Sequence, residues 1–199
     1  MYKKLSIIII LINLAFLLYC DIVTNVKNIY SNLDTFEADI SQINYFSQID
    51  QSLTSNGKLF IQNDSLVILY TEPAFQFIKL ENNIITIYSR QENTAIITKD
   101  HNIFSQNIFK FSDLLNNELS FLSKDDSLLE YEININNQQI KNIKIYINEI
   151  NYQIEKVSYS DDLNNIVNIL ISAQIFNHPL SQNIDEFALP NDVMIIENP

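Results

Sequence analysis

Residues 35–42 decide the fold, and they read Thr35-Phe36-Glu37-Ala38-Asp39-Ile40-Ser41-Gln42. Apolar side chains at the even-numbered positions from Phe36 to Ile40 alternate with polar side chains between them. Successive side chains of a β-strand point to opposite faces, so this period of two predicts a strand with one face buried and one in water. The chain therefore opens a sheet whose apolar face needs a cover.

Short strand-like stretches bounded by polar turn residues follow along most of the chain. They are Gly57–Gln62, Leu66–Thr71, Phe75–Leu80, Ile84–Ser89, Thr94–Thr98, Leu128–Asn134, Ile140–Ile147, Gln153–Tyr159, Ile166–Phe176 and a tail around Val193–Ile196. No helix of roughly 10–15 residues separates neighbouring strands, which argues against a parallel sheet and favours an antiparallel meander.

Asparagine takes the place of glycine at the predicted hairpin turns. Gly57 is the only glycine of the chain. Asparagine is the next-best residue for a positive φ, so we expect turns at Asn82-Asn83, Asn136-Asn137 and Asn63-Asp64-Ser65.

Two stretches have helical rather than strand-like periodicity. Ile22–Leu33 places its apolar residues on one face of a helix. Ser112–Phe121 interrupts the strands, with Ser112 as a candidate N-cap and a leucine stripe that includes Leu115 and Leu119 and extends to Leu122. We expect this second stretch to be a helix or loop that crosses the sheet.

Some strands are apolar on both faces, as in Leu66–Tyr70 and Phe75–Ile78. An antiparallel strand of this kind needs cover on both sides. A helix on one side with a ligand or second layer on the other satisfies this need, and so does an ordinary two-layer core.

Met1–Cys20 reads as a secretory signal, with Lys3 and Lys4 ahead of an apolar run. The run is too short for a comfortable bilayer span, and no later segment comes closer, so we expect a soluble mature protein. Removal of residues 1–20 would delete two lysines and no acid, which makes the formal net charge two units more negative than −12. This acidity disfavours nucleic-acid and anionic-membrane binding and favours solubility.

Residues for catalysis or metal binding are scarce. Cys20 is the only cysteine, which excludes an intrachain disulfide and a cysteine-based metal site. The only histidines, His101 and His178, lie in loop-like stretches. The acid pairs Asp125-Asp126, Asp161-Asp162 and Asp185-Glu186 lack the pattern of a Ca²⁺ loop and fit solvated turns. We therefore predict no catalytic residue, no metal and no cofactor, and a binder of apolar ligands rather than an enzyme.

Five short motifs in order resemble the family of outer-membrane lipoprotein carrier proteins, the LolA-like family. The first is the opening strand Thr35–Gln42, where that family has Phe-x-Ala-x-Phe-x-Gln. The others are Ser55–Ile61, Tyr70-Thr71-Glu72-Pro73, the paired strands within Ile143–Tyr159, and Phe187-Ala188-Leu189-Pro190-Asn191-Asp192-Val193. The resemblance covers nearly all of residues 21–199.

The resemblance implies a single α+β, mainly β domain over residues 21–199, an incomplete antiparallel β-barrel formed by a curved sheet covered by helices. Its apolar cavity would take the acyl chains of lipoproteins. The cavity residues carried over by position are Leu66, Ile68, Tyr70, Phe75, Phe77, Leu115 and Leu119. One departure from the family pattern concerns the residues just before the strand Leu66–Thr71, which would hold the lid of the cavity closed. Gln62-Asn63-Asp64 offers neither the basic residue nor the proline that many members have there.

The resemblance further implies a monomeric, non-enzymatic periplasmic carrier. Its partners would be acylated lipoproteins, an inner-membrane lipoprotein-releasing transporter and an outer-membrane acceptor. Acidic clusters could also steer a basic partner.

Two alternatives remain open. A lipid-anchored outer-membrane receptor on the same fold would require lipidation of Cys20, whereas the bulky Tyr19 favours cleavage after Cys20 and a soluble protein. A structural β protein without a transported ligand is the other alternative.

Overall fold

The computed structural model describes residues 22–99, 108–135 and 140–198. The predicted signal Met1–Cys20, the lipidation candidate Cys20, His101 and the predicted turn at Asn136-Asn137 lie outside these residues. A single sheet of 12 strands dominates the described part of the chain.

The strands are β1 (Thr35–Phe46), β2 (Gln51–Gln62), β3 (Ser65–Glu72), β4 (Gln76–Glu81), β5 (Ile84–Ser89), β6 (Thr94–Thr98), β7 (Glu118–Asp125), β8 (Leu128–Asn134), β9 (Ile140–Asn148), β10 (Ile154–Asp161), β11 (Ile166–Phe176) and β12 (Met194–Asn198). A helix spans residues 22–31, and two short elements follow, α2 (Phe111–Leu115) and the 3₁₀ turn η1 (Ile184–Glu186).

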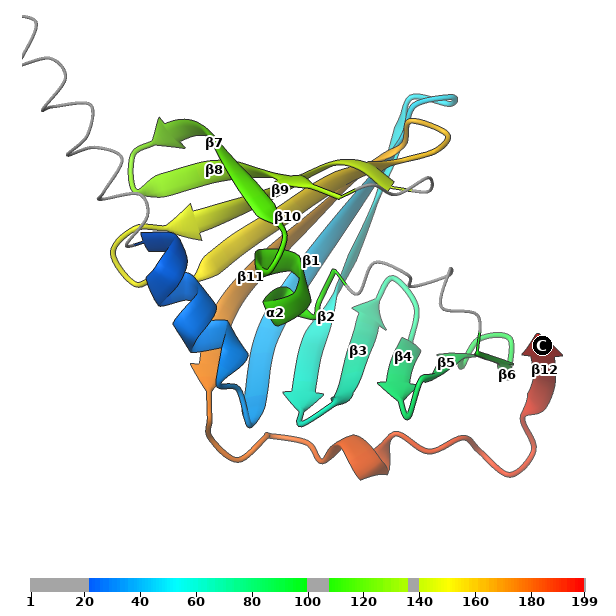
Figure 1. The fold of residues 1–199 in the computed structure, drawn as a ribbon. Coiled ribbons are helices and arrows are strands. Elements are labelled where there is room, and N and C mark those ends of the chain that lie inside the picture. The colour runs from blue at the N-terminus through cyan, green and yellow to red at the C-terminus, as the bar shows by residue number, and fades with distance from the viewer. Residues whose placement is uncertain (1–21, 100–107, 136–139, 199) are drawn as a thin grey trace, which may run out of the picture.

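The sheet is strongly curved and stays open. Its strand order is β12-β6-β5-β4-β3-β2-β1-β11-β10-β9-β8-β7, so β11 pairs with β1 and joins two meanders. All described neighbours are antiparallel except β12, which runs parallel to β6. The helix of residues 22–31 and α2 lie on the concave side (Figure 1). The predicted mainly β fold with an open curved sheet is confirmed.

The strand pattern and the asparagine turns are confirmed where the structure describes them. In β1, Phe36, Ala38 and Ile40 are buried on the concave side. Asn82 and Asn83 have φ angles of 51° and 61° in the β4–β5 turn, and Asn63 has 52° in the β2–β3 turn. Asparagine therefore supplies the left-handed conformation that glycine usually provides.

The predicted helical cover is overstated, because the helix expected at Ser112–Phe121 ends after one turn. The side chain of Asn117 donates to the carbonyl oxygens of Asp113 and Leu114, at 2.8 and 3.2 Å, and so satisfies groups at the end of α2. The next residues form β7, which pairs with β8. Leu119 and Leu122 thus lie on a strand, because pairing with β8 outweighs the local helical pattern.

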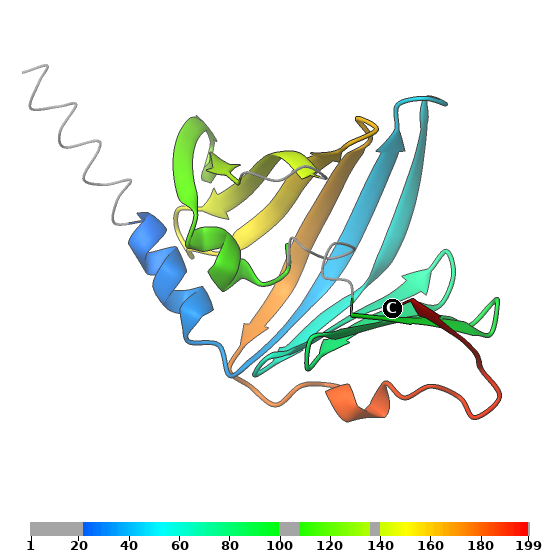
Figure 2. The same ribbon diagram turned by 45° about the vertical axis from the view of Figure 1, so that its right-hand side comes forward.

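The only glycine lies at a bend of the sheet between β2 and β3. The register between β2 and β3 shifts at Asn56 and Gly57. A Cβ at position 57 would overlap the carbonyl oxygen of Leu69, so no other residue leaves room for this approach of the two backbones. Figure 2 shows β3 to β6 turned away from β1 and β2 beyond this bend.

Strand β3 is apolar on both faces because the sheet has a cover on each side. Leu66, Ile68 and Tyr70 belong to the concave core beneath the two helices. Val67 and Leu69 belong to a second core on the convex side. That core is covered by residues 177–193, which we call the C-terminal strap, through Ile184, Phe187 and their neighbours (Figure 1).

A buried carboxylate anchors the strap to the sheet. Glu37 accepts hydrogen bonds from the backbone N–H and the hydroxyl of Ser181, at 2.7 and 2.6 Å, and from Lys58 at 2.8 Å. Burial alone would raise the pKa of Glu37, but the hydrogen bonds from Lys58 and Ser181 outweigh burial and hold this pKa below its ordinary value.

We expect Glu37→Gln to lower the free energy of unfolding at neutral pH by about 2 kcal/mol, because a charge-assisted hydrogen bond contributes roughly 1.5–3 kcal/mol. Since the folded pKa is depressed, the native contribution of Glu37 is complete above its ordinary pKa of 4.5 and is lost as the pH falls through the folded pKa. Denaturant titrations at several acid pH values should show this loss for the native protein and a shallower one for the variant. Asp39→Asn is the control, because Asp39 pairs with the same Lys58 but is half exposed. An equal cost for both variants would contradict the assignment.

Candidate functional site

The concave face of the sheet carries the larger of the two buried apolar clusters in the described part of the chain. Inward-facing residues of β1–β3 and β8–β11 meet residues of the helix 22–31 and of α2 there. The members include Ala38, Ile40, Leu59, Ile145, Val157, Ile169 and Ile171. This interior is apolar in the way that long aliphatic ligands require.

Five of the seven predicted cavity residues belong to this interior. Leu66, Ile68, Tyr70 and Leu115 are buried in it, and Leu119 packs half-buried against it from β7. β3, α2 and β7 bring these side chains together although they lie far apart in the sequence.

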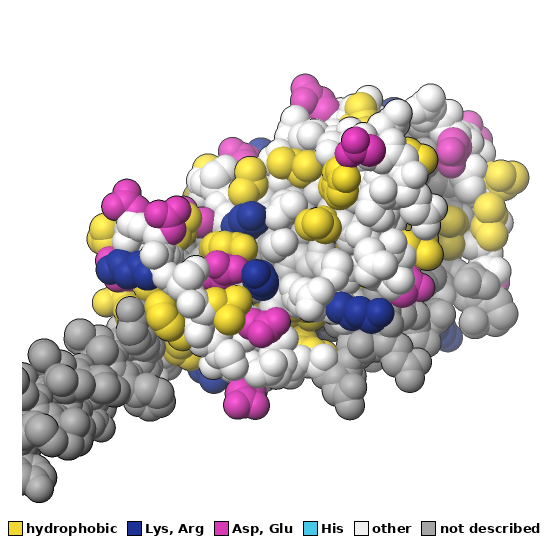
Figure 3. Space-filling model, turned by 90° about the horizontal axis from the view of Figure 1, so that it is seen from above, with side chains coloured by type: hydrophobic (Ala, Val, Ile, Leu, Met, Phe, Trp, Pro, Cys, Tyr) yellow, Lys and Arg dark blue, Asp and Glu magenta, His cyan; other side chains and the backbone are white. Residues whose placement is uncertain are grey.

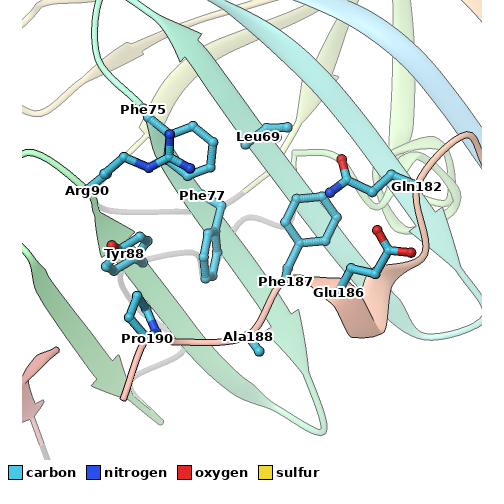
Figure 4. A pocket seen from close by; sticks show the side chains of 10 residues that line it. All are labelled: Leu69, Phe75, Phe77, Tyr88, Arg90, Gln182, Glu186, Phe187, Ala188 and Pro190. Atoms are coloured by element: carbon cyan, nitrogen blue, oxygen red, sulfur yellow. The ribbon is translucent and has the colours of Figure 1, made fainter. Parts of the chain in front are cut away.

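Phe75 and Phe77 lie on the other side of the sheet. They line a convex hollow of about 330 Å³ together with Leu69, Tyr88, Arg90, Gln182, Glu186, Phe187, Ala188 and Pro190. Figure 4 shows the rings of Phe77, Tyr88 and Phe187 gathered between β4, β5 and the strap, with Arg90 over Phe75. The guanidinium carbon lies 3.6 Å from the centre of that ring. These two residues therefore contact the strap rather than the concave interior.

A hollow of about 220 Å³ lies at the rim of the concave interior, between the helix 22–31, the β2–β3 turn and α2. Tyr30, Leu66 and Phe111 form part of its apolar wall. Its charged lining residues are Asp64, Lys110 and Asp113. The residues of the β2–β3 turn that depart from the family pattern, Asn63 and Asp64, thus line this hollow. This hollow therefore lies next to both helical elements that cover the concave interior.

Tyr30 fastens the helix 22–31 to the sheet. Its hydroxyl donates to Oε1 of Gln174 at 2.8 Å and accepts from the backbone N–H of Ile154 at 2.9 Å. Gln174 completes the cluster by donating from Nε2 to the carbonyl oxygen of Ile154 at 2.9 Å. A bulge opposite Ala38, where Ala173 has a φ of 49°, makes this possible because it turns Gln174 toward the concave side.

We expect Tyr30→Phe to lower the free energy of unfolding by about 1–3 kcal/mol, because the buried N–H of Ile154 would lose its partner. Amide hydrogen exchange of Ile154 and of residues 22–31 should become faster. Tyr45→Phe is the matched control, since the Tyr45 hydroxyl contacts only the exposed Asp50, at 2.9 Å. Unchanged exchange of the helix in Tyr30→Phe would show that the helix is held by apolar packing alone.

Three tyrosine hydroxyls lie in or beside the concave interior, and all of them stay protonated. Tyr70 donates to Oε1 of Gln42 at 2.6 Å. Burial raises the pKa of Tyr70 and of Tyr30, and burial with the nearby Asp161 raises the pKa of Tyr159 to about 12. All three tyrosines are therefore neutral at physiological pH and bring no charge into the interior.

Sequence reasoning missed Tyr30 and Gln174 as fastening residues and Glu37 as the anchor of the strap. Glu37 was visible only as a polar position in an alternating strand. Gln174 had one signal, a polar residue near the end of a largely apolar strand, but the bulge that turns it inward leaves no pattern in the sequence.

The described residues offer little for other chemistry. They contain no group of three or more His, Cys, Asp or Glu side chains that is arranged to hold a metal ion. His178 is exposed, and its carbonyl oxygen accepts from the Thr35 hydroxyl at 2.6 Å. Within the described ranges, none of the helices has the length and apolar character needed to cross a membrane.

Comparison with known proteins gives one match in sequence and several in fold. No family model matches the chain. The outer-membrane lipoprotein carrier protein of Campylobacter jejuni is 25% identical over 166 residues, which are 83% of this chain and 88% of that protein. An uncharacterized conserved protein of Thermus thermophilus has a similar fold, with a TM-score of 0.57 at 8% identity over 90% of this chain and 99% of that chain. A LolA superfamily protein of Nitrosomonas europaea aligns with a TM-score of 0.43 at 11% identity over 80% of this chain and 94% of that chain.

Proposed function

We propose, from the premise that the chain is LolA-like, that it is a carrier which binds the acyl chains of lipoproteins against the concave face of its sheet. The premise rests on the similarity to the Campylobacter jejuni lipoprotein carrier along most of both chains. We further propose that the protein works in the periplasm and does not catalyse a reaction. It receives lipoproteins from an inner-membrane transporter and delivers them to an outer-membrane acceptor.

The observation that carries the proposal is the concave apolar interior beneath the helix 22–31 and α2. Burial of acyl groups contributes about 0.8 kcal/mol per CH₂, so one chain of ordinary length supplies useful affinity without polar contacts. In the structure this interior is filled by its own side chains. Cargo must therefore displace a cover.

The helix 22–31 is the cover best suited to move. It is joined to the interior by one apolar face, which buries Val26 and Tyr30, and by the three-residue hydrogen-bond cluster around Tyr30, and no strand of the described residues pairs with it. The hollow beside Tyr30, Leu66 and Phe111 already separates part of this helix from the β2–β3 turn. We place the entry of the acyl chain there.

The test compares two fluorescent peptides of the same sequence, one carrying three acyl chains on its terminal cysteine and one without acyl chains. The purified protein should bind the acylated peptide and not the other, and it should remove acylated lipoprotein from inner-membrane vesicles. A well-folded protein that does neither would refute the carrier function. Intact mass of the native protein then separates carrier from anchored receptor, because lipidation of Cys20 adds a diacylglycerol group.

A further inference from the structure

Two neighbouring hairpin tips expose large aliphatic side chains at one end of the sheet. Ile49 in the β1–β2 turn and Leu163 in the β10–β11 turn are 61% and 55% exposed. Leu53 on β2 and Ile166 on β11, close to these turns, are 45% and 42% exposed. We call residues 47–53 and 161–166 together the hairpin platform. Figure 3 views the molecule from above, toward the end where these hairpins point, and shows hydrophobic side chains among acidic and basic ones on this face.

Hydrogen bonds join the two tips and fix their shape. The backbone N–H of Ser47 donates to Oδ1 of Asn165 at 3.2 Å, and the Ser47 hydroxyl donates to the carbonyl oxygen of Leu163 at 3.4 Å. Asp161 accepts from the backbone N–H groups of Leu163 and Asn165, at 2.9 and 2.8 Å, so the turn that presents Leu163 is held in one conformation. The backbone that carries the exposed aliphatic side chains is thus already ordered, so a partner that binds them loses less conformational entropy.

Only acidic charge surrounds the platform in the sequence. No Lys or Arg occurs between Lys27 and Lys58, and none follows Lys156. The platform itself contains Asp50, Asp161 and Asp162. Pairing of Ser160 with Lys141 of β9 and with Ile166 of β11 places one lysine beside the platform, so three aspartates and one lysine lie at its edge and the local charge stays negative. An apolar patch with a net negative edge is complementary to an apolar patch with a positive rim and disfavours an anionic bilayer or a second copy of the same surface.

We propose that the hairpin platform is a docking surface for a protein partner that presents apolar side chains ringed by lysine or arginine. Hairpin turns ordinarily use polar residues, and grouped exposed apolar side chains mark interaction sites. Ile49 and Leu163 are the anchors in this complex, and the aspartates steer its formation. The proposal does not depend on what the concave interior carries, because the platform residues Ile49 and Leu163 are outside that interior.

The test uses the full protein and a fluorescent amphipathic peptide composed of leucine and lysine as the probe. The Ile49→Ser, Leu163→Ser double variant removes both anchors and should weaken peptide binding at least about tenfold. Ile150→Ser is the matched control, because Ile150 is 77% exposed in the turn between β9 and β10. Its binding should stay within about twofold of that of the unmodified protein, in line with the small effect of most exposed contacts.

Four further measurements make the result decisive, namely salt dependence, hydrogen exchange, vesicle binding and oligomeric state. Added salt should weaken the native complex, and amide hydrogen exchange should slow in residues 47–53 and 161–166 when the peptide binds. Equal binding by the double variant and by the native protein would overturn the proposal. Binding of vesicles rich in anionic lipid through the platform would overturn it in favour of a membrane, and a dimer that the double variant abolishes would overturn it in favour of self-association.

Discussion

A Gly57→Ala protein is expected to lose about 3 kcal/mol of unfolding free energy, at the upper end of the cost of inserting a methyl group into a packed site. In an ordinary strand position the same change would be neutral or stabilising, since alanine restricts the unfolded chain more than glycine does. The sign is reversed here because the new Cβ would overlap the Leu69 carbonyl oxygen. To accommodate it, β3 must move away from β2 at the bend of the sheet.

Equilibrium denaturation in urea measures this effect. Ser52→Ala in the same strand is the control, because Ser52 is exposed and its substitution should change the unfolding free energy by less than about 0.5 kcal/mol. If Gly57→Ala is as stable as the control, the two backbones are not held in contact at the bend, and the shape of the concave face has another origin.

A Leu66→Glu protein is expected to lose binding of the triacylated peptide by at least about tenfold. Leu66 is buried in the concave interior and also forms part of the hollow beside Tyr30. A carboxylate at this position must stay hydrated or become protonated, and either state is unfavourable next to an acyl chain.

Leu170→Glu is the matched control for this prediction. Leu170 pairs with Ser41 and Lys156, is exposed, and lines a hollow on the convex side with Lys58 and Glu72. Circular dichroism and urea denaturation establish that each variant is folded. Leu119→Glu, at a half-buried site of the same interior, replaces Leu66→Glu if the latter does not fold. Equal losses in the concave and convex variants would exclude the concave face as the binding site.

The strands were predictable because each has a local period, whereas the face on which a side chain lies depends on pairing between strands. Phe75 and Phe77 were expected beside Ile68. In the structure Phe77 is paired with Leu69, and Ile68 with Ile78, so Phe77 shares the convex face with Leu69. A shift of one residue in this register would reverse the result, and nothing within either strand sets it.

Long-range contacts, which leave no local pattern, also explain why a helix was expected at Ser112–Phe121 and why the packing of the strap was not foreseen. The leucine stripe of Ser112–Phe121 fits a helix locally, but pairing of Glu118–Asp125 with β8 is a long-range contact. The stretch Phe187–Val193 was recognisable as a motif, yet its packing over Phe60 and Phe77 depends on the path of the whole C-terminal strap.

The two ends of the described sheet, β7 and β12, are not joined to each other. In a closed barrel the number of strands and their stagger fix the radius, so the lumen has one size. An unclosed sheet has no such constraint, because a small change of twist at every strand pair alters its curvature while all interstrand hydrogen bonds persist. The width of the concave side is therefore set by the twist of the sheet, and in the proposed carrier a change of twist would accommodate cargo of different bulk.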